Sequence, residues 1–137
     1  MVGVRGSRYF FYGTLLDAEV RALVLGRARP ALTPARLDGY RRVCVRGRPY
    51  PIVIPDPGGS VAGLLAWPVD RRGAARLDRF EGGEYLKVER PVALAAGRRV
   101  TALVYVARSP AVASARPWSL EAWRRTGKRG LIRRHRR

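Results

Sequence analysis

Two short segments of this 137-residue sequence carry groups that could do chemistry. In the first, Tyr12-Gly13-Thr14-Leu15, an aromatic, β-forming run stops at a glycine shortly before Asp17, which can open a helix. A strand, a tight loop and a helix in that order turn successive backbone N–H groups into one concavity, which can hold a carboxylate or a developing oxyanion. The alternative is an ordinary turn with Tyr12 in the core, because short glycine motifs are weak signals.

The second segment is a predicted helix that Asp70 caps and Gly82 ends. Its spacing places Leu77 and Glu81 on the same apolar face. A carboxylate at the last turn meets the negative end of the helix dipole, and burial would remove its water. Both effects raise the pKa of Glu81 toward the range of a general base near neutral pH. The alternative is that Glu81 faces solvent or pairs with an arginine.

The other reactive side chains narrow the choice of chemistry. The single histidine, His135, lies in a basic run at the C-terminus, and no base lies near the single cysteine, Cys44, in the sequence. A Ser/His/Asp triad, a Cys/His pair and a zinc cluster are therefore excluded. The catalytic acid or base must come from the ten carboxylates, the two lysines, the tyrosines or Cys44. We expect Cys44 to be a bystander, and Asp78 and Glu84 to be solvated surface.

Composition indicates one strongly basic domain over residues 1–137. The net charge is +18, from 28 Lys and Arg against 10 Asp and Glu, and nearly all of the basic residues are arginine. The segment from about residue 124 to 137 has no acidic residue, and we expect a solvated, frayed tail there. Nonspecific contact of this tail with nucleic acid is the alternative.

The N-terminal residues and the cysteine content bear on location. The stretch Met1–Ser7 is short and glycine-rich, and Gly13 and Asp17 interrupt the apolar run that follows. We therefore expect neither a signal peptide nor a membrane span. One cysteine cannot form an internal disulfide, which fits a reducing compartment. The prediction is a cytoplasmic protein.

The remaining pattern predicts an α+β fold. A helix is expected over residues 17–27, and a half-exposed strand after an Asp38-Gly39 turn. Prolines bracket a strand that is expected to form a hairpin, turning at residues 56–60. A second hairpin should turn at Ala96-Gly97, and a short helix should begin near Ser119.

These segments together resemble the gamma-glutamylcyclotransferase superfamily, in particular its AIG2-like branch. The likeness rests on Tyr12-Gly13-Thr14-Leu15 and on the helix that ends Asp78-Arg79-Phe80-Glu81-Gly82, with Tyr85 shortly after. Several further segments occur in the family's order and extend the likeness over most of the chain: residues 34–40, 50–51, 55–61, Gly63 and 102–105.

The resemblance implies a small mixed β-barrel flanked by short helices, with a cavity between the loop and the glutamate. It implies that Tyr12, Gly13, Thr14 and Leu15 bind a γ-glutamyl group largely through the backbone, and that Glu81 is the proton acceptor. The implied enzyme is a cofactor-independent transferase or lyase that releases 5-oxoproline from a γ-glutamyl amine or peptide, without a metal.

Two matters stay open at the level of sequence. Some branches carry Ser-Asn where this chain has Thr14-Leu15, so the resemblance does not fix the amine part of the substrate. A family member that binds a small carboxylate without catalysis, and a basic nucleic-acid-associated module, are the alternative functions.

Overall fold

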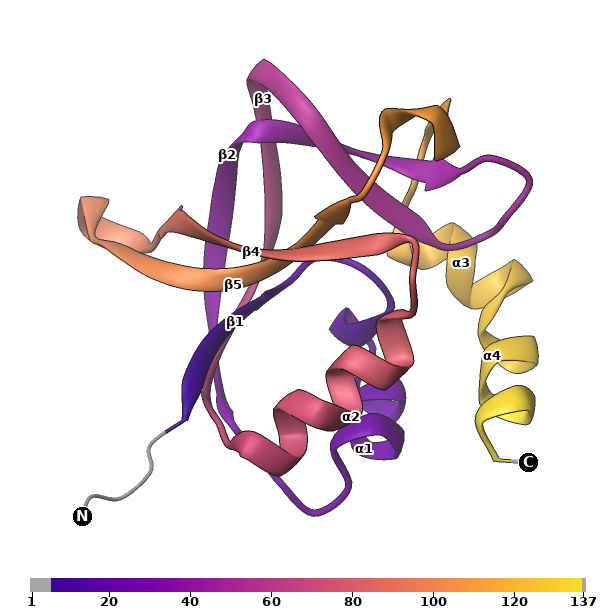
Figure 1. Ribbon diagram of the computed structural model, residues 1–137, viewed down its shortest axis with the longest axis horizontal. Coiled ribbons are helices and arrows are strands. Elements are labelled where there is room, and N and C mark those ends of the chain that lie inside the picture. The colour runs from indigo at the N-terminus through magenta and orange to yellow at the C-terminus, as the bar shows by residue number, and fades with distance from the viewer. Residues whose placement is uncertain (1–5, 137) are drawn as a thin grey trace.

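The computed structural model describes residues 6–136, in which a long antiparallel pair of strands frames a β-barrel (Figure 1). The strands are β1 (Ser7–Phe11), β2 (Ala31–Val45), β3 (Pro51–Val69), β4 (Tyr85–Ala93), β5 (Arg99–Ala107) and β6 (Ala113–Pro117). β2 and β3 pair along most of their length. β3 also pairs with β1, β1 pairs with β5, and β5 pairs with β4. β4 pairs with β2, which closes the ring.

The barrel is mixed because one pairing is parallel. β1 runs parallel to β5 and antiparallel to β3, and the other pairs of the ring are antiparallel. β6 pairs with β2 beyond the ring of five strands. This architecture confirms the predicted α+β class and the small mixed barrel.

Helices lie to one side of the barrel (Figure 1). The described residues contain α1 (Ala18–Leu25), α2 (Arg71–Glu81), α3 (Leu120–Thr126) and α4 (Lys128–His135), with short 3-10 turns η1 (Thr14–Leu16), η2 (Ala95–Gly97) and η3 (Pro110–Val112). Asp17 caps α1 by accepting from the N–H groups of Glu19 and Val20, and Asp70 caps α2 through the N–H of Gly73. The predicted caps of both helices are therefore present.

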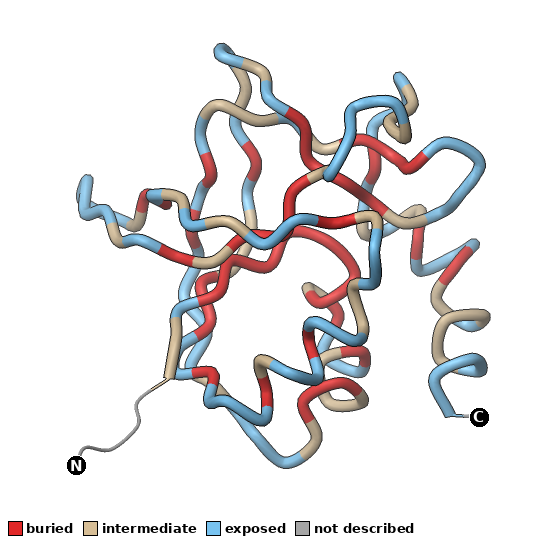
Figure 2. Tube along the Cα trace, viewed as in Figure 1, coloured by how far each residue is buried: buried red, intermediate tan, exposed pale blue. Residues whose placement is uncertain are grey.

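The aromatic run of β1 is buried (Figure 2), and its side chains belong to two different hydrophobic clusters. Phe10 belongs to the cluster that fills the barrel, whereas Tyr9 and Phe11 belong to the cluster between barrel and helices. All three side chains are at most 2% exposed. A strand buried on both sides has no polar alternation, which explains why this stretch is continuously apolar. The loop that follows β1 therefore begins in the interior of the protein.

The predicted hairpin over residues 50–67 is wrong, because both halves of this segment belong to the single strand β3 and pair with β2. The register jumps where Asp38 faces Ser60 and Tyr40 faces Pro55. Residues 56–59 of β3 therefore form a bulge opposite Gly39, which has a φ of +86°. The predicted Asp38-Gly39 turn is wrong, because both residues lie within the strand β2. The hairpin of β4 and β5, which turns through η2, is confirmed.

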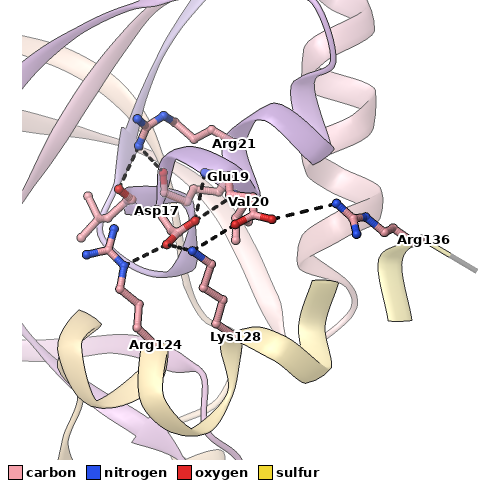
Figure 3. Close-up of polar contacts among 9 residues, drawn as sticks. Asp17, Glu19, Val20, Arg21, Arg124, Lys128 and Arg136 are labelled. Carbon is pink, nitrogen blue, oxygen red and sulfur yellow. Dashed lines mark hydrogen bonds and ion pairs between the residues drawn. The ribbon is translucent and has the colours of Figure 1, made fainter. Parts of the chain in front are cut away.

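The basic C-terminal segment is helical, and the expectation of a frayed tail is wrong. Its anchor is Asp17, whose side chain is 1% exposed (Figure 3). Arg124 Nε and Lys128 Nζ each lie 2.9 Å from Asp17 Oδ2, and Lys128 Nζ also lies 3.2 Å from Glu19 Oε1. These ion pairs hold α3 and α4 against the start of α1. Contact of the segment with nucleic acid stays a prediction.

Two expectations about location concern other parts of the chain. Within residues 6–136, no helix is both long enough and apolar enough to cross a bilayer. The expected absence of a signal peptide concerns Met1–Ser7, and residues 1–5 of that stretch lie outside the described residues. A cytoplasmic location stays a prediction.

Candidate active site

The loop after β1 is packed so closely that Gly13 has no room for a side chain. A β-carbon at Gly13 would lie 2.6 Å from Pro51 Cγ, which is well inside contact distance. Arg42 fixes the loop from the other side, since its Nη1 donates to the Tyr12 carbonyl at 2.8 Å. The loop is therefore held in one conformation by its neighbours.

The backbone of this loop offers unused donors. Leu16 N–H donates to Gly13 O at 2.9 Å and Asp17 N–H to Thr14 O at 3.0 Å, which closes the turn of η1. Within the described part of the chain, no hydrogen bond is donated by the N–H groups of Gly13, Thr14 or Leu15. Buried donors without a protein partner are costly, so a ligand that accepts from them would be stabilised.

Glu81 is the last residue of α2 and faces the interior. Leu77, one turn earlier, is fully buried and fixes that face of the helix. No ion pair or hydrogen bond involves the Glu81 carboxylate among residues 6–136. Burial, and secondarily the negative charge of Asp78, raise the pKa of Glu81 to about 8. The alternative of an arginine-paired Glu81 does not hold.

The loop and the glutamate meet in one place. A small cavity of about 20 Å³ is lined by Tyr12, Gly13, Thr14 and Leu15 together with Glu81. A larger cavity of about 700 Å³ adjoins it, because Thr14, Glu81 and Tyr85 line both. The structure therefore brings all five predicted site residues together. Their roles in binding and catalysis stay predictions.

Three tyrosines line the small cavity beside the glutamate, and two of them, Tyr85 and Tyr105, are not among the predicted site residues. Tyr85 Oη donates to Pro51 O at 2.6 Å, Tyr105 Oη donates to Asp78 Oδ1 at 2.6 Å, and Tyr12 Oη donates to the Tyr105 carbonyl. Burial foremost, with the charge of Glu81 among the further causes, raises the pKa of each hydroxyl. Since each proton is already committed, these oxygens can only accept from a ligand, as an ammonium group would require.

Two carboxylates predicted to be plain surface support the site. Asp78 accepts from Tyr105 and also from Lys87 Nζ, at 3.2 Å. Partial burial would raise the pKa of Asp78, but these hydrogen bonds outweigh it and lower the pKa, so its negative charge persists beside Glu81. Glu84 accepts from Tyr50 Oη at 3.2 Å and lines the larger cavity. Asp78 is exposed as predicted, although it also carries these contacts, whereas Glu84 is half-buried, so the prediction of solvated surface is wrong for Glu84.

Other candidate groups lie away from this site. Cys44 is buried and lines neither cavity, and its thiol donates weakly to Pro117 O at 3.7 Å. This agrees with the expectation of a bystander. In the described part of the chain, no three His, Cys, Asp or Glu side chains gather in a way that could hold a metal ion.

Comparison with known proteins identifies the family of this chain. The model of the family described as "Gamma-glutamyl cyclotransferase, AIG2-like" matches residues 9–125. AIG2-like protein A of Arabidopsis thaliana is 35% identical over 79 residues, which are 58% of this chain and 47% of that protein. AIG2-like protein C of the same plant is 37% identical over 76 residues, or 56% of this chain and 44% of that protein. The chain thus aligns with about half the length of the curated relatives it matches.

Solved structures extend the similarity to nearly the whole chain. A solution structure of an Arabidopsis thaliana protein superimposes with a TM-score of 0.71 at 27% identity, covering 98% of this chain and 82% of that one. A structure described as a gamma-glutamyl cyclotransferase has a TM-score of 0.66 at 24% identity, covering 75% of this chain and 67% of that one, and supports the fold. With the family model matching most of its length, the chain belongs to the AIG2-like gamma-glutamyl cyclotransferase family.

Proposed function

We propose that this protein is a γ-glutamyl cyclotransferase, which turns a γ-glutamyl amine or peptide into 5-oxoproline and a free amine. The observation that carries the proposal is Glu81, a carboxylate without a protein partner that shares one cavity with the donors of the Gly13 loop. Membership of the family supports the same reaction class.

The substrate supplies the positive charge that the site lacks. Its α-ammonium group would pair with Glu81, and the hydroxyl oxygens of Tyr12, Tyr85 and Tyr105 surround the same space as acceptors. A carboxylate with a pKa of about 8 is well matched to take a proton from an ammonium group. Proton transfer to Glu81 leaves a neutral amine nitrogen with a free electron pair.

Ring closure follows within the bound substrate. The amine nitrogen attacks the γ-carbonyl carbon, and the carbonyl electrons move to its oxygen. The N–H groups near Gly13, Thr14 and Leu15 would stabilise that oxyanion. Because nucleophile and carbonyl belong to one molecule held in a folded conformation, little further ordering is needed to reach the transition state.

Collapse of the intermediate completes the reaction. The oxyanion electrons re-form the carbonyl as the bond to the leaving nitrogen breaks. Glu81 returns the proton to that nitrogen, and the regenerated carboxylate then takes the second proton from the ring nitrogen, which becomes the lactam N–H. This second proton passes to the departing amine, which leaves as an ammonium ion, and the carboxylate is free again. Every step uses groups of the substrate and of this chain.

The test is the release of 5-oxoproline from a panel of γ-glutamyl amines and peptides. For the compound that wild type turns over best, we expect Glu81→Gln to lower kcat by about 10²- to 10⁴-fold, because the proton acceptor is lost while the shape is kept. Glu89→Gln on the exposed part of β4 removes the same charge away from the cavities and should have wild-type activity.

Two results would contradict the proposal. One is the absence of 5-oxoproline from every compound with the wild-type protein. The other is saturable binding of a γ-glutamyl compound by wild type and Glu81→Gln alike, without product, which would instead indicate a non-catalytic binding protein.

A further inference from the structure

The peptide that joins Tyr12 to Gly13 has a charged partner on its carbonyl. Arg42, on β2, donates from Nη1 to Tyr12 O at 2.8 Å. The carbonyls of Gly13 and Thr14 accept instead from neutral backbone N–H groups of the turn η1 and its cap. These three peptides are the ones that carry the free N–H groups of Gly13, Thr14 and Leu15. Within residues 6–136, only the peptide with the Gly13 N–H is therefore bound by a cation.

The two ends of this peptide face opposite sides of the loop. The Tyr12-Gly13 bond is trans, and the C=O and N–H of a trans peptide point in opposite directions. Because Arg42 binds the Tyr12 carbonyl, the Gly13 N–H points away from that arginine. Gly13 lines the small cavity together with Glu81, whereas Arg42 lines neither of the two cavities. The peptide thus connects a cation behind the loop with the space in which the substrate would react.

The Arg42 guanidinium is a fixed positive charge, since arginine does not lose its proton in proteins. The Trp118 ring covers it, with Arg42 Cζ 5.2 Å from the ring centroid, and Trp118 is itself buried. Trp118 Nε1 donates to Pro49 O at 2.8 Å, which holds the ring in place. A cation that is stacked on an indole and shielded from water acts on a neighbouring carbonyl more strongly than a solvated cation does.

The surroundings of Arg42 are not those of a residue placed for stability alone. Its Nε is buried and has no hydrogen-bond partner in the described part of the chain. No carboxylate among residues 6–136 forms an ion pair with the half-buried Arg42. A buried donor left in this state costs free energy of folding, and such a group in a native protein calls for a functional explanation. The hydrogen bond to the Tyr12 carbonyl indicates what that function acts on.

We propose that Arg42 is a positioning residue of this enzyme, which holds and polarises the Tyr12-Gly13 peptide so that the Gly13 N–H stabilises the oxyanion of the substrate. This inference rests on the proposed cyclotransferase activity and adds to it a residue outside the two cavities. A charged donor at the carbonyl draws electron density along the peptide, which makes the N–H at the other end a stronger donor. The loop is also fixed before the reaction begins, so it need not reorganise as negative charge develops.

The kinetics of 5-oxoproline release test this role, with the γ-glutamyl compound that wild type turns over best. We expect Arg42→Gln to lower kcat by about tenfold or more and to change KM by less than about twofold, because the oxyanion develops only after the substrate has bound. Arg42→Lys keeps the charge and should recover part of kcat. Arg41→Gln removes the same charge from the neighbouring, exposed position of β2, and should leave both constants at their wild-type values.

An NMR measurement follows the same peptide without any activity. We expect the backbone amide signal of Gly13 to move in Arg42→Gln, to lie closer to its wild-type position in Arg42→Lys, and to stay in place in Arg41→Gln. In the wild-type protein, the guanidinium N–H protons of Arg42 should exchange slowly with water, because the Tyr12 carbonyl and the Trp118 ring enclose the group. This last measurement needs no variant, so it tests the arrangement even where Arg42→Gln does not fold.

Three results would overturn the inference and leave the cyclotransferase activity standing. Folded Arg42→Gln with the kcat of wild type would show that the cation does not act on catalysis. A raised KM with unchanged kcat would show that the Gly13 N–H serves substrate binding and not the oxyanion. Fast exchange of the Arg42 guanidinium protons in wild type would show that the enclosed contact with Tyr12 does not exist. If wild type releases no 5-oxoproline from any compound of the panel, the proposed function itself fails, and this inference fails with it.

Discussion

Asp17 is a buried carboxylate at the start of α1, Glu81 is a half-buried carboxylate at the end of α2, and their surroundings shift the two pKa values in opposite directions. Burial would raise the pKa of Asp17, but hydrogen bonds from Lys128, Arg124 and the Val20 N–H outweigh it and hold the pKa at about 2. Glu81 has no such partner, and burial foremost raises its pKa to about 8. One carboxylate is permanently charged, and the other is poised to exchange a proton.

This contrast shows that a carboxylate is paired only where a Lys or Arg side chain lies close to it and points toward it. The number of cationic residues in the chain does not decide this. The chain has 28 Lys and Arg for 10 Asp and Glu, so partners are abundant. Arg76 and Arg79 lie on the helix that Glu81 ends and line the same cavity, yet neither pairs with it. A half-buried acid left without a partner amid so many arginines is the arrangement that a substrate cation would complete.

We expect the largest effect when the free energy of unfolding of wild type is compared with that of Glu81→Gln as a function of pH. The folded protein holds the Glu81 proton more tightly than the unfolded chain, whose pKa is the ordinary 4.5. Wild-type stability is therefore full below that value and declines as pH rises toward about 8. Relative to Glu81→Gln, wild type should lose about 4 kcal/mol over this window.

Urea denaturation of both proteins across this pH range measures the difference. Glu89→Gln, which alters an exposed carboxylate of β4, serves as the control and should follow wild type. Parallel stability curves for wild type and Glu81→Gln would show that the Glu81 carboxylate is ordinarily solvated, contrary to the structure.

The Asp17 carboxylate should have a smaller effect on stability, and its pH dependence should be opposite to that of Glu81. The pKa of Asp17 is lower in the folded protein than the ordinary 3.8. Its contribution to the free energy of unfolding is therefore present above that value and is lost as the pH falls through about 2. Asp17→Asn, which keeps a capping side chain, should cost about 2 kcal/mol at neutral pH and almost nothing near the acid end.

Denaturant titration at neutral and acid pH checks this, with Glu19→Gln as the comparison. Glu19 also faces Lys128 but its side chain is 49% exposed, so its loss should change stability by less than about 0.5 kcal/mol. A neutral-pH cost for Asp17→Asn no larger than that of Glu19→Gln would remove the distinction between the two carboxylates of α1 and its cap.

The sequence alone predicts the components of the site but not their surroundings. Helical spacing places Glu81 on the face of Leu77, and the halt of the apolar run at Gly13 predicts the strand, loop and helix that follow. Whether Glu81 meets an arginine depends on where side chains of other elements point, and no local pattern encodes that. The tyrosines show the same limit, because Tyr85 and Tyr105 are at once core residues and cavity walls.

The wrong predictions also have long-range causes. Residues 56–60 have good turn chemistry, but pairing of both halves of β3 with β2 turns this stretch into a bulge. The C-terminal segment looks like a solvated tail because its own sequence has no acid after Glu121. Its partner, Asp17, lies 107 positions from Arg124 in sequence. Tertiary contacts of this kind override local propensity.

The most direct test of this account is an NMR titration of the side-chain carboxyl carbons in the ligand-free protein, with the two signals assigned by Glu81→Gln and Asp17→Asn. We expect the Glu81 signal to titrate near pH 8 and the Asp17 signal to remain that of a carboxylate until the pH approaches about 2. A Glu81 signal that titrates near the ordinary value of 4.5 would contradict the account, because the proposed proton acceptor would then be an unremarkable surface acid.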